Sequence, residues 1–317
     1  MENLKVTPEQ EKQVKALGFL RNRGTDNFSG RIITINGKTT AAQQICVAEA
    51  AEKFGNGHVL FTTRLTIEVP GIPYDKIEEF RSYIAKEGLE TGGTGSKVRP
   101  IVACKATTCK FGLIYGYALS EEIHERFYKG YRNVKLPHKF KIGVGGCPNN
   151  CIKPDLNDLG VIGQLVPIFD EELCNGCKKC SVVDVCPMNA AEVADGVLSI
   201  DEEICNNCGR CIGKCHFDAI GEGKTGYKIA IGGRWGKKVK RGMSINKIFK
   251  DKEEVMSVIE KMILIYREQG ITGERLADTI ERIGFENIEA QLLSDEILER
   301  KQEILDADLH SVGGATC

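Results

Sequence analysis

The cysteines are the residues whose number and spacing most directly suggest chemistry. The chain has 14 of them in 317 residues, and its first residues, MENLKVTPEQEKQVK, lack the apolar core of a signal peptide. A cytoplasmic location is therefore expected, where many cysteines argue for metal ligation rather than disulfides. Twelve cysteines form three sets of four. Cys46 and Cys317 stand outside these sets, and each is interpreted as a small buried residue or a spare thiol.

Two of the sets form consecutive repeats within residues 169–222. Each repeat has three cysteines spaced C-x2-C-x2-C and a fourth that trails them, which is the bacterial pattern for two [4Fe–4S] clusters. In that pattern the trailing cysteine ligates the other cluster. The expected ligands of cluster I are Cys174, Cys177, Cys180 and Cys215. The expected ligands of cluster II are Cys205, Cys208, Cys211 and Cys186.

These repeats depart from the usual pattern in two places. Five residues separate Cys180 from Cys186, and His216 stands where a proline often follows the last cysteine. The longer spacing is expected to bulge the start of the following helix without removing a ligand. Two zinc sites are the alternative, but three evenly spaced thiolates in each run suit a cubane better than paired zinc knuckles.

The third set consists of the pairs Cys104/Cys109 and Cys147/Cys151. Each pair follows a predicted strand in a glycine-rich setting. Two such pairs can hold a cubane or a single zinc ion. The spacing favours the cubane and leaves the zinc ion open.

The elements that must position these cysteines follow from the hydrophobic pattern. The N-terminal part is expected to contain helix 8–18, strand 31–35, helix 39–55, two strands that flank Thr63, and helix 72–88. This order is that of a split βαβ, ferredoxin-like layer. Further on we expect strand 101–104, helix 119–129, strand 136–146, and a strand with a basic glycine-rich loop at 227–242. Residues 251–309 are charged and helical in pattern, and are interpreted as a solvated cover over the core. The fold class is α+β.

The composition limits the possible partners. Hydrophobic residues make up 42% of the chain and charged residues 27%, and the formal net charge is −1. This balance gives no general attraction to nucleic acid or to an acidic membrane surface. No apolar run approaches the roughly 18 residues that span a bilayer. No nucleic-acid partner and no membrane span are expected.

Several motifs together resemble the siroheme-dependent sulfite and nitrite reductases. GCPNNC (146–151), with the C-x4-C pair before it, is similar to that family's siroheme-cluster motif. FTTRLTIEVPGI (61–72), KVRPIVAC (97–104) and LPHKFK (136–141) resemble further family segments in the same order. The repeat followed by YKIAIGGRWGKK (227–238) makes the chain most similar to the anaerobic sulfite reductase type, which has an inserted two-cluster ferredoxin domain.

The resemblance implies three parts. Residues 1–90 would be the ferredoxin-like α+β half-domain, and residues 91–168 with 223–317 would be the siroheme and [4Fe–4S] binding domain. Residues 169–222 would be an inserted ferredoxin domain with two [4Fe–4S] clusters. The third set of cysteines would then hold a third [4Fe–4S] cluster, with Cys151 shared as the axial ligand of a siroheme. The family's first pair is more often C-x5-C, so the turn between Cys104 and Cys109 must be tighter.

The resemblance also suggests cationic residues for an oxyanion and for the carboxylates of siroheme. Arg64, Lys139 and Lys141 match the family's anion-binding residues, and the two lysines, two apart on a predicted strand, should share one face. A solvated outer face is the alternative for the lysines. Arg31 is displaced from the family's further arginine. Candidates for the siroheme cradle are Arg99, Gly232, Gly233, Arg234, Lys237, Lys238 and Arg241; a generic basic loop is the alternative for those at 234–241.

The implied activity is the six-electron reduction of sulfite to sulfide, with electrons that pass through clusters I and II. Reduction of nitrite to ammonia at the same site is one alternative, and a polyferredoxin electron carrier without a tetrapyrrole is the other. No NAD or flavin fingerprint is found, so an electron-donating reductase subunit or ferredoxin is needed. Larger family members contain two pseudo-repeats of this fold and this chain has one. We therefore expect a homodimer or a heteromeric complex.

Overall fold

A computed structural model describes residues 6–311 of the chain, so Cys317 lies outside the described residues. The chain folds into two compact units. The first takes in the residues up to Ala103, Ser120–Ile142 and the residues from Ile259 onward. The second is formed by Cys104–Leu119 and Gly143–Val258.

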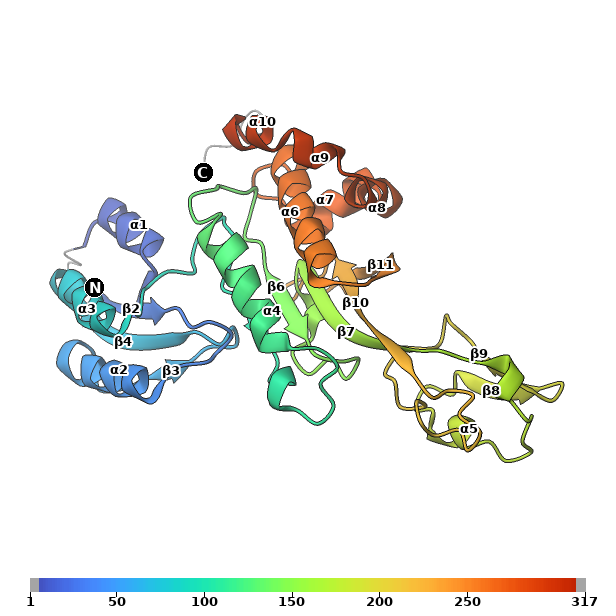
Figure 1. Ribbon diagram of the computed structural model, residues 1–317. Coiled ribbons are helices and arrows are strands. Elements are labelled where there is room, and N and C mark those ends of the chain that lie inside the picture. Colours follow the sequence, from blue (N-terminus) through green and yellow to red (C-terminus); the bar gives the residue numbers. More distant parts are fainter. Residues whose placement is uncertain (1–5, 312–317) are drawn as a thin grey trace. The chain divides into compact units, whose positions relative to one another are not determined.

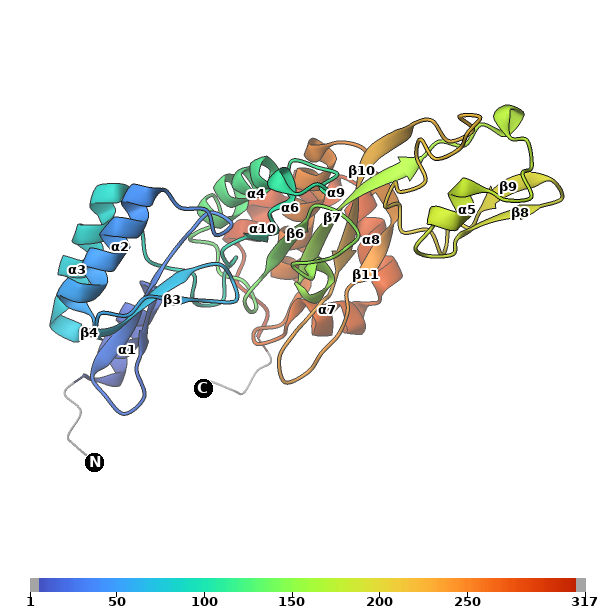
Figure 2. The same cartoon turned by 90° about the horizontal axis from the view of Figure 1, so that it is seen from below.

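The first unit begins with a four-stranded antiparallel sheet. Its strand order is β1 (Phe19–Arg21), β2 (Asn27–Ile32), β4 (Ile67–Pro73) and β3 (Leu60–Phe61). Helices α2 (Ala41–Phe54) and α3 (Ile77–Ile84) lie side by side on one face of this sheet, whereas α1 (Pro8–Ala16) packs beside β1 (Figures 1 and 2). The fully buried rings of Phe19, Phe28 and Phe80 fill the space between the layers. This arrangement confirms the ferredoxin-like layer, although the first strand was not predicted and β2 lies earlier than expected.

Helix α2 shows why this layer is well specified by its sequence. Thr40 forms a capping box with Gln43, which satisfies two backbone N–H groups at the start of the helix. Apolar residues then recur on the inner face, and Cys46 among them is only 6% exposed. The interpretation of Cys46 as a small buried residue is confirmed.

The C-terminal helices differ most from expectation. They are α6 (Lys252–Gln269), α7 (Leu276–Ile283), α8 (Phe285–Leu293), α9 (Glu296–Glu299) and α10 (Lys301–Asp306). Residues 262–266 of α6 are completely buried, so the interpretation of the whole region as a solvated cover was wrong for this helix. A helix that is apolar on all sides must lie in a core, and the charges that flank this stretch concealed it. Arg267 follows at once and caps α10 by donating to the carbonyls of Ile304, Leu305 and Ala307.

The second unit is organised by a long pairing between β7 (Leu159–Pro167) and β10 (Gly223–Ile231). These strands are antiparallel and join nine residue pairs, from Pro167↔Gly223 to Leu159↔Ile231. They belong to a sheet with the order β11-β10-β7-β6-β5, which adds β11 (Met243–Phe249), β6 (Ile142–Gly145) and β5 (Val102–Ala103). The chain leaves the ladder after Pro167 and returns to it at Gly223.

The segment between β7 and β10 forms a small body of its own, which we call the insert (168–222). It contains α5 (Ser181–Val185) and a hairpin of β8 (Ala191–Ala194) and β9 (Val197–Ile200). A core of four buried residues holds it together, namely Val182, Ala191, Leu198 and Ile220. The five residues between Cys180 and Cys186 are helix α5 itself, so the longer spacing adds a helical turn. Within residues 6–311, no helix combines the length and apolar character needed to cross a membrane.

A row of buried polar side chains runs along one helical face of the first unit. Helix α4 (Gly116–Ile123) continues as a π-helical segment, His124–Lys129. Ser120, His124 and Tyr128 recur every four residues, and each is less than 8% exposed. The Asn36 side chain donates to Ser120 Oγ at 2.6 Å, and the His124 ring stacks near that of Tyr128 at 4.7 Å.

The burial of His124 predicts an acid-sensitive fold. Burial, followed by the nearby Lys129 and opposed by Glu125, lowers the pKa of His124 below its usual 6.5. Below pH 6.5 the unfolded imidazole binds a proton that the buried one does not, so stability falls as pH falls. A His124→Gln variant should show a shallower decline in its free energy of unfolding, measured in denaturant above and below pH 6.5. His58→Gln, at an exposed site, should keep the parent decline, and an identical slope in both variants would refute the assignment.

Candidate metal centres and anion-binding residues

The third set of cysteines gathers in the second unit. Burial raises the pKa of the Cys147 thiol, the backbone N–H of Asn149 opposes this, and the charges of the other three thiols raise it further. Those thiols are Cys104, Cys109 and Cys151. The Gly146 N–H donates to Cys104 Sγ at 3.2 Å and so joins one pair to the other. Cys151 is the exposed member of the set.

Small residues allow these two cysteine turns to approach each other. A short 3-10 turn, Ala106–Thr108, closes the tight spacing between Cys104 and Cys109. A Cβ added to Gly146 would lie 2.0 Å from the Cβ of Ala106, and one added to Gly112 would lie 2.0 Å from the carbonyl oxygen of Ala106. The turns can therefore pack at this distance only because these positions are glycine.

The four predicted ligands of cluster II also converge. Cys186, Cys205, Cys208 and Cys211 line one cavity of the insert. Burial raises the pKa of Cys211 to about 11, and the neighbouring thiols of Cys205, Cys208 and Cys186 contribute in the same direction. The Ala190 N–H donates to Cys186 Sγ at 3.3 Å. Three thiols from one run and the trailing thiol of the other thus face a shared space, as the two-cluster pattern requires.

The predicted ligands of cluster I surround the small core of the insert. Cys174, Cys180 and Cys215 pack against it, and the Leu198 N–H donates to Cys174 Sγ at 3.4 Å. Cys177 is half-buried. None of the 13 described cysteines is in a disulfide. Free thiols with backbone N–H donors suit iron–sulfur ligation, because such donors stabilise the charge on cluster sulfur. No group of three or more His, Cys, Asp or Glu side chains in the described part of the chain is placed to hold a single metal ion.

Three of the predicted arginines, Arg31, Arg64 and Arg99, contact the backbone at or near residues 93–100 of the first unit. Arg31 and Arg99 both donate to the carbonyl oxygen of Gly93, at 3.2 and 2.5 Å. Arg31 also forms an ion pair with Glu68, its partner across β2 and β4, at 2.7 Å. Arg64 donates to the carbonyl oxygens of Pro100 and Ile142, at 2.8 and 3.3 Å. The sequence had assigned Arg99 to the siroheme cradle and had not linked it with Arg31.

Lys139 and Lys141 are linked to residues 97–99 by the backbone of Phe140, which lies between them. Phe140 is fully buried; its N–H donates to Lys97 O at 3.0 Å and its carbonyl accepts from the Arg99 N–H at 2.8 Å. Both lysines are half-buried on either side of it. The segment is therefore extended, as predicted, although the strand β6 begins only at Ile142.

The predicted siroheme cradle forms a basic hairpin in the second unit. Arg234 and Lys240 exchange backbone hydrogen bonds of 2.9 and 3.0 Å, and Lys237, Lys238 and Arg241 are exposed. A Cβ on Gly233 would lie 2.3 Å from the carbonyl oxygen of Asp155, in the turn that follows Cys151. The close backbone approach predicted for this glycine thus occurs within the chain itself. It brings the hairpin to the turn after the exposed thiol.

Sequence reasoning missed the polar row of Ser120, His124 and Tyr128. Burial raises the pKa of Tyr128 to about 12, and its hydroxyl contacts the backbone of Gly93, where Arg31 and Arg99 meet. His124 Nδ1 is buried and makes no hydrogen bond within residues 6–311. The available signal was the recurrence of Ser120, His124 and Tyr128 at intervals of four, which places them on one helical face.

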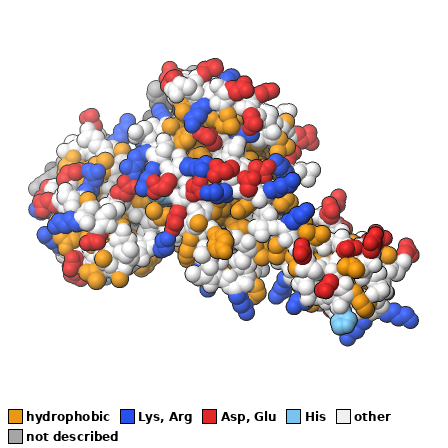
Figure 3. Space-filling view, viewed as in Figure 1, with side chains coloured by type: hydrophobic (Ala, Val, Ile, Leu, Met, Phe, Trp, Pro, Cys, Tyr) orange, Lys and Arg blue, Asp and Glu red, His pale blue; other side chains and the backbone are white. Residues whose placement is uncertain are grey.

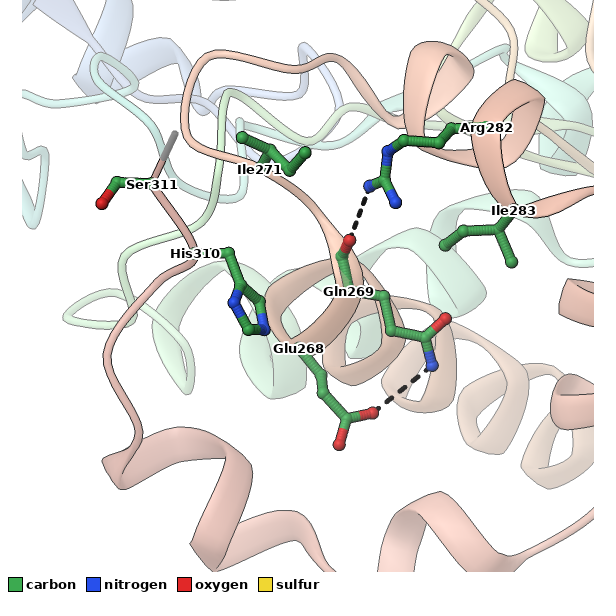
Figure 4. Close-up of a pocket in the computed structure, with 7 residues that line it drawn as sticks. All are labelled: Glu268, Gln269, Ile271, Arg282, Ile283, His310 and Ser311. Carbon is green, nitrogen blue, oxygen red and sulfur yellow. Dashed lines mark hydrogen bonds between the residues drawn. The ribbon is translucent and has the colours of Figure 1, made fainter. Parts of the chain in front are cut away.

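One open pocket of the first unit contains none of the predicted residues. Glu268, Gln269, Arg282 and His310 are among its lining residues. Figure 4 shows Arg282 directed at the carbonyl oxygen of Gln269, at 2.7 Å, and the Gln269 amide directed at Glu268. Glu268 also pairs with Arg300, and Arg282 with Glu274. The charges of this pocket therefore neutralise one another.

Comparison with known families identifies two matched regions. Residues 94–301 match the family described as the nitrite and sulphite reductase 4Fe-4S domain. Residues 21–87 match the nitrite/sulfite reductase ferredoxin-like half domain. A crystal structure of dissimilatory sulfite reductase I covers 84% of this chain with a TM-score of 0.67 and 22% identity, over 69% of its own length. This likeness confirms the α+β reductase fold.

The curated relatives with activity names include sulfite reductases and nitrite reductases. The coenzyme F420-dependent sulfite reductase of Methanocaldococcus jannaschii is 31% identical over 75% of this chain and 38% of its own length. A subunit of the anaerobic sulfite reductase of Salmonella typhimurium is 29% identical over 47% of each chain. The chain thus spans less than half of either relative.

Substitution of Gly146 tests the packing of the two cysteine turns. A Gly146→Ala variant should lose the iron of one cubane and keep the remainder, because the new methyl group would push the turn of Cys104 and Cys109 away from that of Cys147 and Cys151. Iron per chain and the electron paramagnetic resonance of the reduced protein measure this. Gly221→Ala, where the new methyl group meets only ordinary contacts, is the control. Parent iron content in Gly146→Ala would contradict the arrangement.

Proposed function

The chain belongs to the nitrite and sulphite reductase family, and from that premise we propose that it catalyses the six-electron reduction of sulfite to sulfide. One observation carries the proposal beyond the family. Arg31, Arg64 and Arg99, from three separate segments of the first unit, donate to backbone carbonyls of Gly93 or Pro100, and Lys139 and Lys141 flank Phe140, whose backbone bonds to Lys97 and Arg99. An electron carrier has no need of such a concentration of cations, whereas an enzyme that binds a small oxyanion does.

The second unit offers residues that fit the expected cofactors. Cys104, Cys109, Cys147 and Cys151 would hold a [4Fe–4S] cluster, and Cys151, the exposed thiol, would also ligate a siroheme. The basic hairpin at 234–241 supplies cations for the carboxylates of that group. When bound, the siroheme and its cluster supply electrons to the anion. The insert would hold clusters I and II.

Each cation has a distinct role in this proposal. Arg31 and Arg99 offer planar guanidinium groups that suit an oxyanion. Lys139 and Lys141 carry protons that can be given to oxygen as it leaves, since a lysine in a partly buried site can change its protonation state. Arg64 acts as a positioning residue, because it donates to the carbonyls of the residues that follow Arg99 and Lys141. Its guanidinium thereby holds these two segments together.

The remaining features of the proposal concern organisation. We propose the three-part division at residues 90, 169 and 222; the gap between the matches over 21–87 and 94–301 supports the first of these boundaries. We also propose that the chain receives electrons from a separate reductase subunit or ferredoxin and acts as a homodimer or in a heteromeric complex. A cytoplasmic location remains a prediction of the sequence.

The two lysines provide the decisive test. Lys139→Met and Lys141→Met should each lower the rate of sulfide formation about 100-fold or more, since each removes a cation and a proton donor at the anion. The rate is measured with photoreduced deazaflavin as electron donor, with sulfite and nitrite compared in parallel. Lys135→Met, at an exposed site in the same segment, should retain the parent rate.

The visible spectrum of the anaerobically purified protein accompanies this assay. Siroheme bands in every variant would show that the lysines act on the anion and not on cofactor binding. Parent rates in both lysine variants would refute their role. A protein without siroheme bands, after expression with siroheme supplied, would instead be an electron carrier. A faster reaction with nitrite would assign that anion as the main substrate.

A further inference from the structure

Charge is distributed unevenly over the insert. Residues 169–222 contain eleven acidic residues and only four basic ones, which are Lys178, Lys179, Arg210 and Lys214. All four are exposed, and their side chains make no hydrogen bond or ion pair with a described residue. Figure 3 shows Lys and Arg side chains with a histidine along the lower edge of the insert, whereas Asp and Glu side chains lie mainly above them. Arg210 lies within the cysteine run of cluster II, and the other three adjoin cysteines of cluster I.

Three of these cations flank predicted ligands of cluster I. Lys178 and Lys179 lie between Cys177 and Cys180, and Lys214 directly precedes Cys215. The exposed rings of His216 and Phe217 follow, in an edge-to-face contact of 5.4 Å, and Phe217 is 43% exposed. We call the surface formed by Lys178, Lys179, Lys214, His216 and Phe217 the cluster I face. These residues supply an exposed aromatic ring and three exposed lysines, and aromatic side chains are enriched at protein docking surfaces.

Cluster II is oriented differently within the same unit. The Asn207 carbonyl accepts from the Leu165 N–H at 2.8 Å, and Cys208 pairs with Leu165 across a parallel bridge. A Cβ on Gly209 would lie 2.6 Å from the Leu165 side chain. The loop of cluster II is therefore packed onto β7. The exposed pair Glu202 and Glu203 precedes Cys205 just as Glu171 and Glu172 precede Cys174, and Arg210 is the one cation in the cysteine run of cluster II.

We propose that the cluster I face is the docking surface for a small acidic electron-transfer protein, and that electrons enter the chain at cluster I. This rests on the proposed function, because it requires the cysteines of the insert to hold clusters. An acidic partner is attracted by Lys178, Lys179 and Lys214, whereas the cysteine run of cluster II carries only Arg210, so the cations favour entry at cluster I. In each encounter the reduced centre of the donor loses one electron and cluster I gains it. Cluster II, packed against β7, is then the next acceptor.

Charge reversal on the full holoprotein tests this surface. The double variant Lys178→Glu/Lys179→Glu and the single variant Lys214→Glu are compared with Lys224→Glu, a reversal at an exposed site on β10. A reduced bacterial ferredoxin of net negative charge serves as one donor, and uncharged photoreduced deazaflavin serves as the other. The ferredoxin-driven rate of cluster reduction, followed by absorbance bleaching, should fall about tenfold or more in the first two variants and lose most of its salt dependence. The deazaflavin-driven rate should not change.

The outcomes separate this inference from the proposed function. A parent ferredoxin rate in the double variant, or an equal loss in Lys224→Glu, would overturn the docking surface. Cluster bleaching needs no sulfite, so the surface can be confirmed even if no sulfide is formed in any variant. If the double variant fails to load its iron, Lys178→Gln/Lys179→Gln removes the charge without reversing it. In that variant the ferredoxin-driven rate should fall by less than in the charge reversal, and the deazaflavin-driven rate should not change. An unchanged ferredoxin-driven rate would refute the docking surface.

Discussion

The antiparallel ladder between β7 and β10 is the constraint on which the second unit depends. Its nine residue pairs fix two distant features at once. At Pro167↔Gly223 the chain enters and leaves the insert, and beyond Leu159↔Ile231 the Gly232 N–H donates to the Asp158 carbonyl and begins the basic hairpin. Because a strand advances by about 3.4 Å per residue, these ends are separated by about 27 Å of rigid backbone. The pairing of β7 with β10 therefore fixes where the insert leaves the sheet and where the basic hairpin begins.

Close packing and thiol burial act together at the cysteine turns. Gly146 allows the two turns to meet at Ala106, Gly112 allows the first turn to close on itself, and burial in this packing removes water from Cys147. Burial favours the neutral thiol, so metal binding must release protons there. The backbone N–H of Asn149 offsets part of this cost at Cys147, and backbone N–H groups also donate to the sulfur atoms of Cys104, Cys186 and Cys174. A chain arranged in this way holds its ligands close together without a disulfide among the described residues.

The first unit holds several positively charged side chains near one another. Arg31 is neutralised in part by Glu68, and Arg31, Arg64 and Arg99 all donate to backbone carbonyls. Carbonyl oxygens carry partial negative charge, so they orient guanidinium groups without cancelling them. The buried row that ends at Tyr128 lies against the same backbone at Gly93. The glycine-rich loop is therefore contacted by residues that lie far from it in the sequence.

The sequence by itself determined the groups of cysteines, the reductase fold and the layer of α2 and α3. Ligands in one turn are separated by a few residues, so their spacing carries the information directly, and capping boxes and apolar periodicity are equally local. The tertiary structure alone decided that Arg99 meets Arg31, that Gly233 packs against the turn after Cys151, and that α6 is buried and not solvated. It also showed that His124 and Tyr128 are buried and that the Tyr128 hydroxyl contacts the backbone of Gly93. These relations join segments far apart in the chain, and their distances depend on how whole elements pack, which no local pattern records.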